Sequence, residues 1–149
     1  MSEEIAVRVK LNDAIILLMS QSIQKTTLCF VINDNKILLL ERKDTWYENE
    51  KYLPPGGNVD EGEDPKNACV RELLEETGIQ VDVTKMKLLW NYSNELVGRL
   101  FDNYYYITTE YQGELDNKEP HRHSDVAWFS LDKLPKNTSQ IVYDTLNRI

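Results

Sequence analysis

The chain has 149 residues, of which 41% are hydrophobic and 28% are charged, and its formal net charge is −8. These values predict one globular domain over residues 1–149, with an extension at 1–24 of uncertain structure, and they exclude a disordered chain. The excess of acids argues against a nucleic-acid-binding surface, because phosphates attract Lys and Arg.

The location of the protein is predicted from its apolar runs. The longest such run near the start covers residues 14–19, well short of the ~20 residues that cross a bilayer. The first residues also lack the basic start, apolar stretch and cleavage site of a signal peptide. We therefore expect a cytoplasmic protein without a membrane partner.

The first third of the chain reads as a β-hairpin followed by a loop. Residues 15–23 fit either a short helix or an irregular strand. Two apolar runs, 26–32 and 36–41, are joined by Asn33-Asp34-Asn35, which predicts a hairpin. Residues 53–57, Leu-Pro-Pro-Gly-Gly, suit neither a helix nor a central strand.

The rest of the chain predicts helices set among strands. Asp64 and Pro65 are typical of a helix start, and Gly78 is typical of a helix end, so a helix is expected over 64–77. Later segments predict strands at 79–83, 86–92, 100–109 and 125–129, and a last helix at 139–148. This order favours an α+β fold, in which a mixed sheet has helices packed on its faces.

The helix over 64–77 has two faces at ~100° per residue. The expected core face holds Cys69, Val70, Leu73, Leu74 and Thr77. The opposite face holds three carboxylates, Glu72, Glu75 and Glu76. Such a face is either a solvated acidic surface or a set of hard oxygen ligands for Mg²⁺ or Mn²⁺.

Acidic residues concentrate around this helix. From Asp60 to Glu76 there are seven acids and two bases, so five of the eight excess negative charges lie in 17 residues. Clustered carboxylates repel one another unless they are solvated or a cation neutralises them.

The wider pattern around these acids resembles the Nudix box of the MutT-like hydrolases. It reads Gly57, five residues, Glu63, seven residues, Arg71-Glu72-Leu73, one residue, Glu75-Glu76, one residue, Gly78-Ile79. Seven fixed identities give a chance match of about one in 10⁸ per starting position. The segments before the box and at 125–135 also resemble the family, which covers about residues 25–149. The resemblance implies an α/β/α sandwich with the mixed sheet between the helices.

The resemblance also implies roles for single residues. Glu72, Glu75 and Glu76 are implied metal ligands, with the carbonyl of Gly56 as a further ligand. Arg71 is implied to organise the carboxylates, and Glu63 to support that network or bind a second ion. The implied catalytic group is Glu63, Arg71, Glu75 and Glu76.

The base that activates water stays open. The candidates are Glu75, Glu76 and an acid outside the box, for which Glu119 is the candidate.

Substrate contacts are less closely defined. Gly57, Trp46 and Glu119 are the candidates. Only one or two of eight aromatic residues are expected to face a pocket, and the eight are Trp46, Tyr47, Trp90, Tyr92, Tyr104, Tyr106, Trp128 and Phe129. His121 and His123 alternate without a third His or Cys nearby, which is typical of a solvated loop. The two cysteines, Cys29 and Cys69, are expected to be buried apolar residues.

Three functions remain compatible with the sequence. The first is a Mg²⁺- or Mn²⁺-dependent pyrophosphohydrolase that cleaves a nucleoside triphosphate, normal or oxidised, to the monophosphate and pyrophosphate. The second is the same chemistry on ADP-ribose or a nucleotide sugar, and the third is a Nudix-fold binding module without turnover. A nucleotide is the expected partner in each case, and a homodimer is left open.

Overall fold

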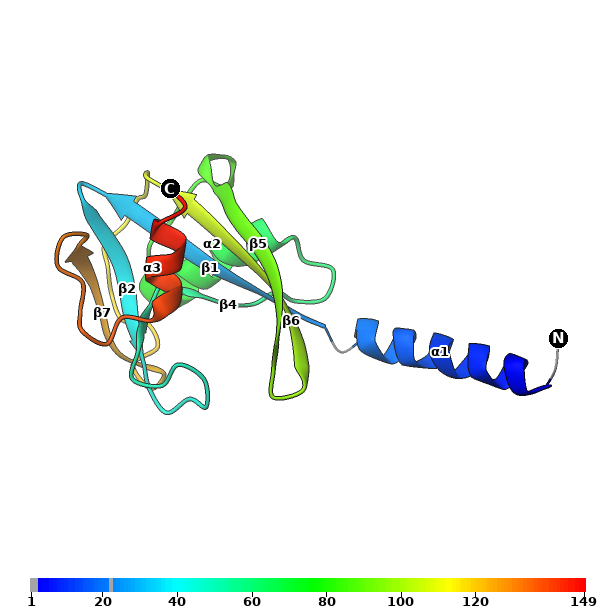
Figure 1. Ribbon diagram of the computed structural model, residues 1–149. Helices are drawn as coiled ribbons and strands as arrows, with labels where there is room; N and C mark the ends of the chain where they lie inside the picture. The colour runs from blue at the N-terminus through cyan, green and yellow to red at the C-terminus, as the bar shows by residue number, and fades with distance from the viewer. Residues whose placement is uncertain (1–2, 22) are drawn as a thin grey trace.

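The computed structural model describes residues 3–21 and 23–149 (Figure 1). Nothing is described of the side chains at 9 and 17–21. In chain order the elements are α1 (Glu3–Gln21), β1 (Gln24–Asn33), β2 (Lys36–Arg42), β3 (Tyr52–Leu53), β4 (Gly56–Asn58), α2 (Pro65–Thr77), η1 (Val83–Lys85), β5 (Lys87–Leu96), β6 (Arg99–Thr108), β7 (His123–Ser130) and α3 (Gln140–Leu146).

The sheet is mixed and divides around β1. β1 runs parallel to β6 from Gln24 to Val31, and β6 pairs antiparallel with β5. On its other edge, β1 pairs with β4 near its start and with β2 near its end. β2 then carries β3 and β7. β1 is therefore the strand that joins the two halves of the sheet.

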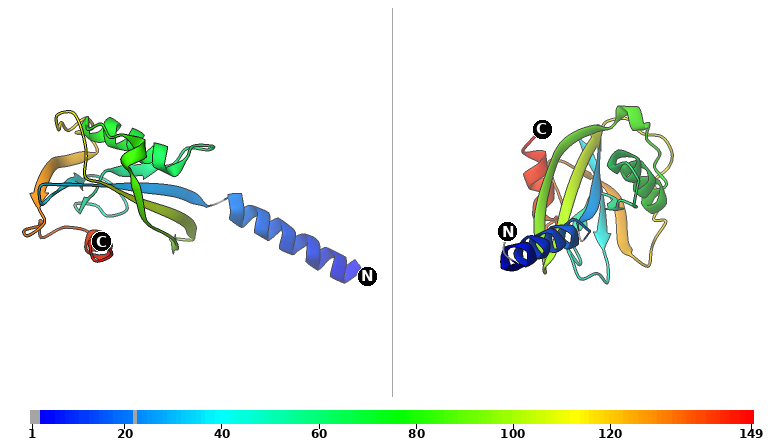
Figure 2. Two further views of the ribbon diagram at one scale, coloured as in Figure 1. Left: turned by 90° about the horizontal axis from the view of Figure 1, so that it is seen from above. Right: turned by 90° about the vertical axis from the view of Figure 1, so that its right-hand side faces the viewer.

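Two helices cover opposite faces of this sheet, as Figure 2 shows for α2 and α3. Because side chains alternate along a strand, β1 supplies both layers. Cys29 and Val31 pack in the layer of α2, whereas Phe30 packs in the layer of α3. The expected α/β/α sandwich is confirmed.

Local sequence explains the hairpin and the ends of α2. Asp34 and Asn35 have φ of 53° and 57°, the left-handed values that a two-residue hairpin turn requires. The Asp64 side chain accepts a hydrogen bond from the backbone N–H of Lys66, and Gly78 ends α2 with φ of 75°. Both predictions are confirmed.

One expectation about strands is wrong. Residues 79–83 form no strand, because only Gln80 pairs, with Gln112, and the Asp82 side chain then caps the 3₁₀ turn η1. Residues 53–57 form neither a helix nor a central strand, as expected, because Leu53 ends β3 at one end of the strand order and Gly56 begins β4, which pairs with β1. The backbone of β1 lies against Gly56 where a side chain would not fit.

The faces of α2 also differ from expectation at two positions. Leu74, expected in the core, is 43% exposed, and Glu76, expected on the polar face, is 5% exposed. The helix packs against β1 and β4, and the backbone N–H of Gly56 in β4 donates a partly buried hydrogen bond to the Glu76 carboxylate.

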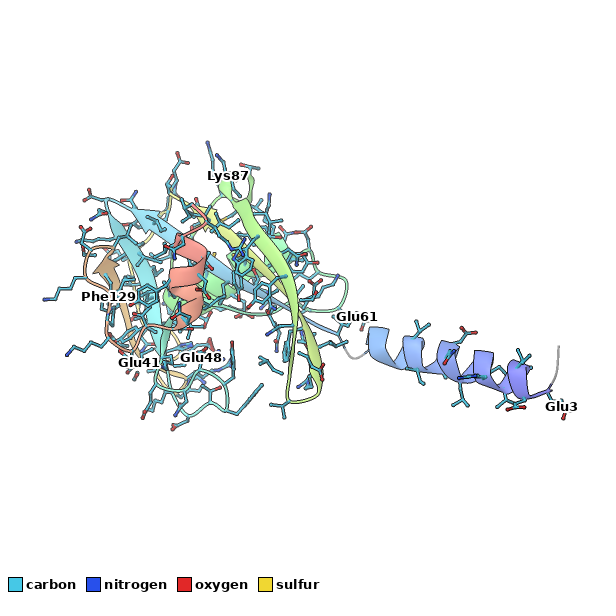
Figure 3. All side chains as sticks on the ribbon, in the orientation of Figure 1. Glu3, Glu41, Glu48, Glu61, Lys87 and Phe129 are labelled. Atoms are coloured by element: carbon cyan, nitrogen blue, oxygen red, sulfur yellow. The ribbon has the colours of Figure 1, made fainter. Side chains whose placement is uncertain are left out.

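Within the extension, residues 3–21 form the helix α1, and Gln24 begins β1. This helix projects from the start of β1, away from the sheet (Figures 1 and 2), and the side chains drawn on it lie outside the body of the sheet and its two covering helices (Figure 3). No helix within residues 3–21 or 23–149 is long and apolar enough to cross a membrane.

Two adjacent leucines test how α2 packs. Leu73 is fully buried and Leu74 is not. We expect Leu73→Ala to lower the free energy of unfolding by about 2–5 kcal/mol, because it leaves a cavity in the core. The matched Leu74→Ala should cost less than about 1 kcal/mol. Urea unfolding of both variants measures the difference, and equal losses would contradict this orientation of the helix.

Candidate active site

Arg71, on α2, holds a group of carboxylates together. Its Nε and Nη2 donate to the two oxygens of Glu63, each at 2.9 Å, and its Nη1 donates to Oε1 of Glu72 at 3.0 Å. Nη1 also lies 3.3 Å from Oε2 of Glu75, and Nη2 donates to the backbone O of Asn58. Two-pronged pairing of this kind fixes direction as well as distance.

The pairing of Arg71 with Glu63 stabilises the charged form of each side chain. Hydrogen bonds from Arg71 lower the pKa of Glu63, and pairing with Glu63 raises the pKa of Arg71. The guanidinium is therefore fixed and charged, and it offsets part of the repulsion among the acids of the box.

Glu72 is held close to the β4 backbone. Its side chain is 16% exposed, and burial followed by the nearby charge of Glu76 raises its pKa to about 7, against the opposing effect of Arg71. A Cβ on Gly57 would lie 2.7 Å from the Glu72 carboxylate. Only glycine at 57 leaves this carboxylate where it is.

Glu76 is the most deeply buried acid of the box. Its Oε1 accepts from the backbone N–H of Gly56 at 2.7 Å, and its Oε2 lies 3.1 Å from Nε2 of His123. Burial raises its pKa, and the contact with His123 opposes that rise. Glu119 comes close as well, since donor atoms of Glu76, Glu119 and His123 lie within 4.8 Å of one another.

A cavity of about 700 Å³ adjoins these carboxylates, a size suited to a small organic ligand. Glu72, Glu76, Gly56 and Gly57 form part of its wall. Further lining comes from four cations and five aromatic side chains, Arg42, Lys43, Arg99, Arg122, Trp46, Tyr47, Tyr92, Phe101 and Tyr105. The cavity therefore joins carboxylates, cations and aromatic rings.

The residues expected from the sequence fall into three groups. Glu72, Glu76, Gly56, Gly57 and Trp46 border the cavity. Glu63 and Arg71 form the network behind it, and Glu75 is exposed at the edge of that network. Glu119 lies beside Glu76.

Two expectations about the cavity and its loop are wrong. Of the aromatic residues proposed, three rather than one or two line the cavity, namely Trp46, Tyr47 and Tyr92. His123 is 6% exposed, so it does not lie in a solvated loop, because it begins β7 and packs beside Glu76. His121 is exposed and borders the cavity.

Arg42 and Asn103 also line the cavity, and the sequence did not predict either of them as a site residue. Arg42 ends β2 and its guanidinium lies over the Tyr47 ring at 5.8 Å. Asn103 lies on β6 and its side chain bonds to Thr26 and Asn94. A charged or amide residue at the end or middle of a strand carries no local signal, since its role depends on which strand lies alongside.

The donor set fits a divalent cation that prefers oxygen ligands. Glu72 and Glu76 are carboxylates drawn together at a partly buried wall, and the proximity of Glu76 raises the pKa of Glu72. A cation there would offset this repulsion, and clustered carboxylate oxygens suit Mg²⁺ or Mn²⁺.

The comparisons with known proteins agree with this geometry. The model of the NUDIX domain matches residues 22–148. An oxidized purine nucleoside triphosphate hydrolase from Danio rerio is 32% identical over 111 residues, covering 73% of this chain and 67% of that protein. An RNA pyrophosphohydrolase from Sphingopyxis alaskensis is 29% identical, covering 69% of this chain and 74% of that protein.

A solved structure has the same fold. The MutT NUDIX hydrolase from Burkholderia pseudomallei superposes with a TM-score of 0.77 at 29% identity, covering 85% of this chain and 98% of that one. With the box around α2 intact, the chain belongs to the Nudix hydrolase family.

Proposed function

We propose that the protein is a divalent-metal-dependent pyrophosphohydrolase that cleaves a nucleoside triphosphate, normal or oxidised, to the monophosphate and pyrophosphate. The observation that carries this proposal is the meeting of Glu72 and Glu76 with a cavity lined by cations and aromatic rings. The names of the relatives support it, since they describe enzymes that act on phosphoanhydrides.

In this proposal Glu72, Glu75 and Glu76 hold the cation, with the Gly56 carbonyl as a further ligand. A bound Mg²⁺ or Mn²⁺ supplies charge neutralisation at the diphosphate and makes water a better nucleophile. Arg71, supported by Glu63, fixes the direction of the ligand side chains. Such support keeps the ligands in place before substrate binds.

Two kinds of side chain in the cavity wall suit the two parts of a nucleotide, its phosphates and its base. Lys43 and Arg122 offer positive charge to the phosphates, whereas Tyr92 and Trp46 offer flat apolar faces to a base. Trp46 is 67% exposed, so a base stacked on it would remove apolar surface from water. Glu119 and Glu75 or Glu76 remain the candidates for the group that takes the proton from water.

A substrate panel tests this function. The panel holds normal and oxidised deoxynucleoside triphosphates, ADP-ribose, dinucleoside polyphosphates and a 5′-triphosphate RNA, with Mg²⁺ or Mn²⁺ and with EDTA. We expect one nucleoside triphosphate to have the highest kcat/KM, and EDTA to abolish turnover. A preference for ADP-ribose or RNA would replace the proposed substrate, and no turnover by folded protein would leave a binding module.

The cytoplasmic location expected from the sequence stays a prediction. Whether the protein forms a homodimer is an open question that light scattering would answer.

A further inference from the structure

His123 contacts the box but has no part in the reaction proposed above. It begins β7, where the pairing with β2 shifts register between Glu41 and Arg42. Its backbone N–H donates to the carbonyl of Glu119, and its own carbonyl accepts from the Asn117 side chain. Hydrogen bonds on both sides of the His123 backbone therefore fix the position from which its imidazole extends.

The imidazole meets one oxygen of Glu76 while the backbone meets the other. His123 Nε2 lies 3.1 Å from Oε2, and the N–H of Gly56 donates to Oε1 at 2.7 Å. His123 and Glu76 are 6% and 5% exposed, so the contact between their side chains is largely shielded from water. Each carboxylate oxygen keeps a second lone pair, and the two bonds together fix the plane of the carboxylate.

The second nitrogen shows whether His123 is itself a metal ligand. In the part of the chain that is described, Nδ1 of His123 is buried without a hydrogen-bond partner. A metal-bound imidazole nearly always donates its other N–H to an acceptor. Ligation through Nε2 would put the proton on Nδ1 and leave a buried donor unpaired, whereas a proton on Nε2 is used by Glu76.

We propose that His123 is a positioning residue, which donates its Nε2–H to Glu76 and so holds that carboxylate in the direction needed to bind a divalent cation. This inference rests on the proposed function only in taking Glu76 as a ligand. Substitution of His123 should therefore weaken cation binding in the absence of any nucleotide.

The experiment compares two amides that donate from different places. In Gln the amide nitrogen reaches the place of Nε2, and in Asn it reaches the place of Nδ1. The dissociation constant of Mn²⁺ is measured by electron paramagnetic resonance on the full chain, with circular dichroism as a check of folding. We expect His123→Asn to weaken Mn²⁺ binding by about 10- to 100-fold and His123→Gln to restore most of the affinity.

A double variant tests that the effect passes through Glu76. In a Glu76→Gln background, His123→Asn should cause no further loss of Mn²⁺ affinity, because the bond to the ligand no longer matters. Equal affinities of the Asn and Gln variants would overturn the proposal, as would an additive loss in the double variant.

The wild-type protein gives an answer that does not depend on the folding of any variant. Pulsed electron paramagnetic resonance of bound Mn²⁺ detects the coupling of a directly bound nitrogen. We expect none, and such a coupling would make His123 a ligand and overturn the positioning role. Failure of wild-type protein to bind Mn²⁺ would overturn it too. Mn²⁺ binding without hydrolysis of any nucleotide would remove the proposed function alone.

Discussion

Glu76→Gln is expected to lower kcat by about 10²- to 10³-fold, or about 3–4 kcal/mol of transition-state stabilisation. The amide keeps the size of the side chain and an acceptor for the Gly56 N–H, so the fold should survive. It loses the negative charge that, in the proposed function, faces the cation and the diphosphate. Steady-state hydrolysis of the best triphosphate at saturating Mg²⁺ measures the loss, and unchanged thermal unfolding confirms the fold.

The matched control removes a negative charge outside the network. Glu61 is exposed on the loop between β4 and α2, where Figure 3 labels it, and Glu61→Gln should leave kcat unchanged. Wild-type kcat in Glu76→Gln would contradict the assignment of Glu76 as a ligand. An equal fall in both variants would mean that net charge, rather than the site, sets the rate.

Arg71→Lys is expected to reduce kcat/KM by about 10- to 100-fold although the charge is kept. One ammonium group cannot pair with both oxygens of Glu63 and also reach Glu72 and Glu75, as the guanidinium does. The planar fork of Arg is what matches a carboxylate with two bonds. The carboxylates should then lose their alignment, so the Mg²⁺ concentration for half-maximal rate should rise as well.

Titration of activity with Mg²⁺ separates this effect from a general loss of enzyme. Lys66→Gln removes a cation from the first turn of the same helix and should leave the Mg²⁺ dependence as in the wild type. If Arg71→Lys also keeps the wild-type Mg²⁺ dependence, Arg71 does not organise the ligands.

The elements with strong local signals were predictable from the sequence. The hairpin of β1 and β2 follows from two apolar runs around Asp34 and Asn35, whose φ values are those of a tight turn. The limits of α2 follow from Asp64 and Gly78. In each case one or two residues determine the backbone, so distant parts of the chain are not needed.

Other features depend on residues far away in the chain. The segment 79–83 is apolar enough for a strand, but its neighbour allows only one bridge, between Gln80 and Gln112. A helical wheel places Glu76 among solvated acids, because its burial requires the backbone of Gly56 and the imidazole of His123. A helical wheel of α2 includes neither Gly56 nor His123, since both lie outside the helix.

The site shows the same division. The spacing of the box gives Arg71 its position among the carboxylates, because those residues share one helix and the loop before it. Arg42, Asn103 and His123 come from three strands that meet only after folding, so their neighbourhood was not readable from spacing.

Identification of the products tests the central claim most directly. The protein is incubated with its best nucleoside triphosphate and Mg²⁺, and the phosphorus species are resolved by nuclear magnetic resonance, with EDTA in a parallel sample. Carboxylates that hold a cation against a diphosphate predict the nucleoside monophosphate and pyrophosphate in equal amounts, and no products with EDTA. Nucleoside diphosphate with inorganic phosphate, or turnover that persists in EDTA, would contradict the proposed mechanism.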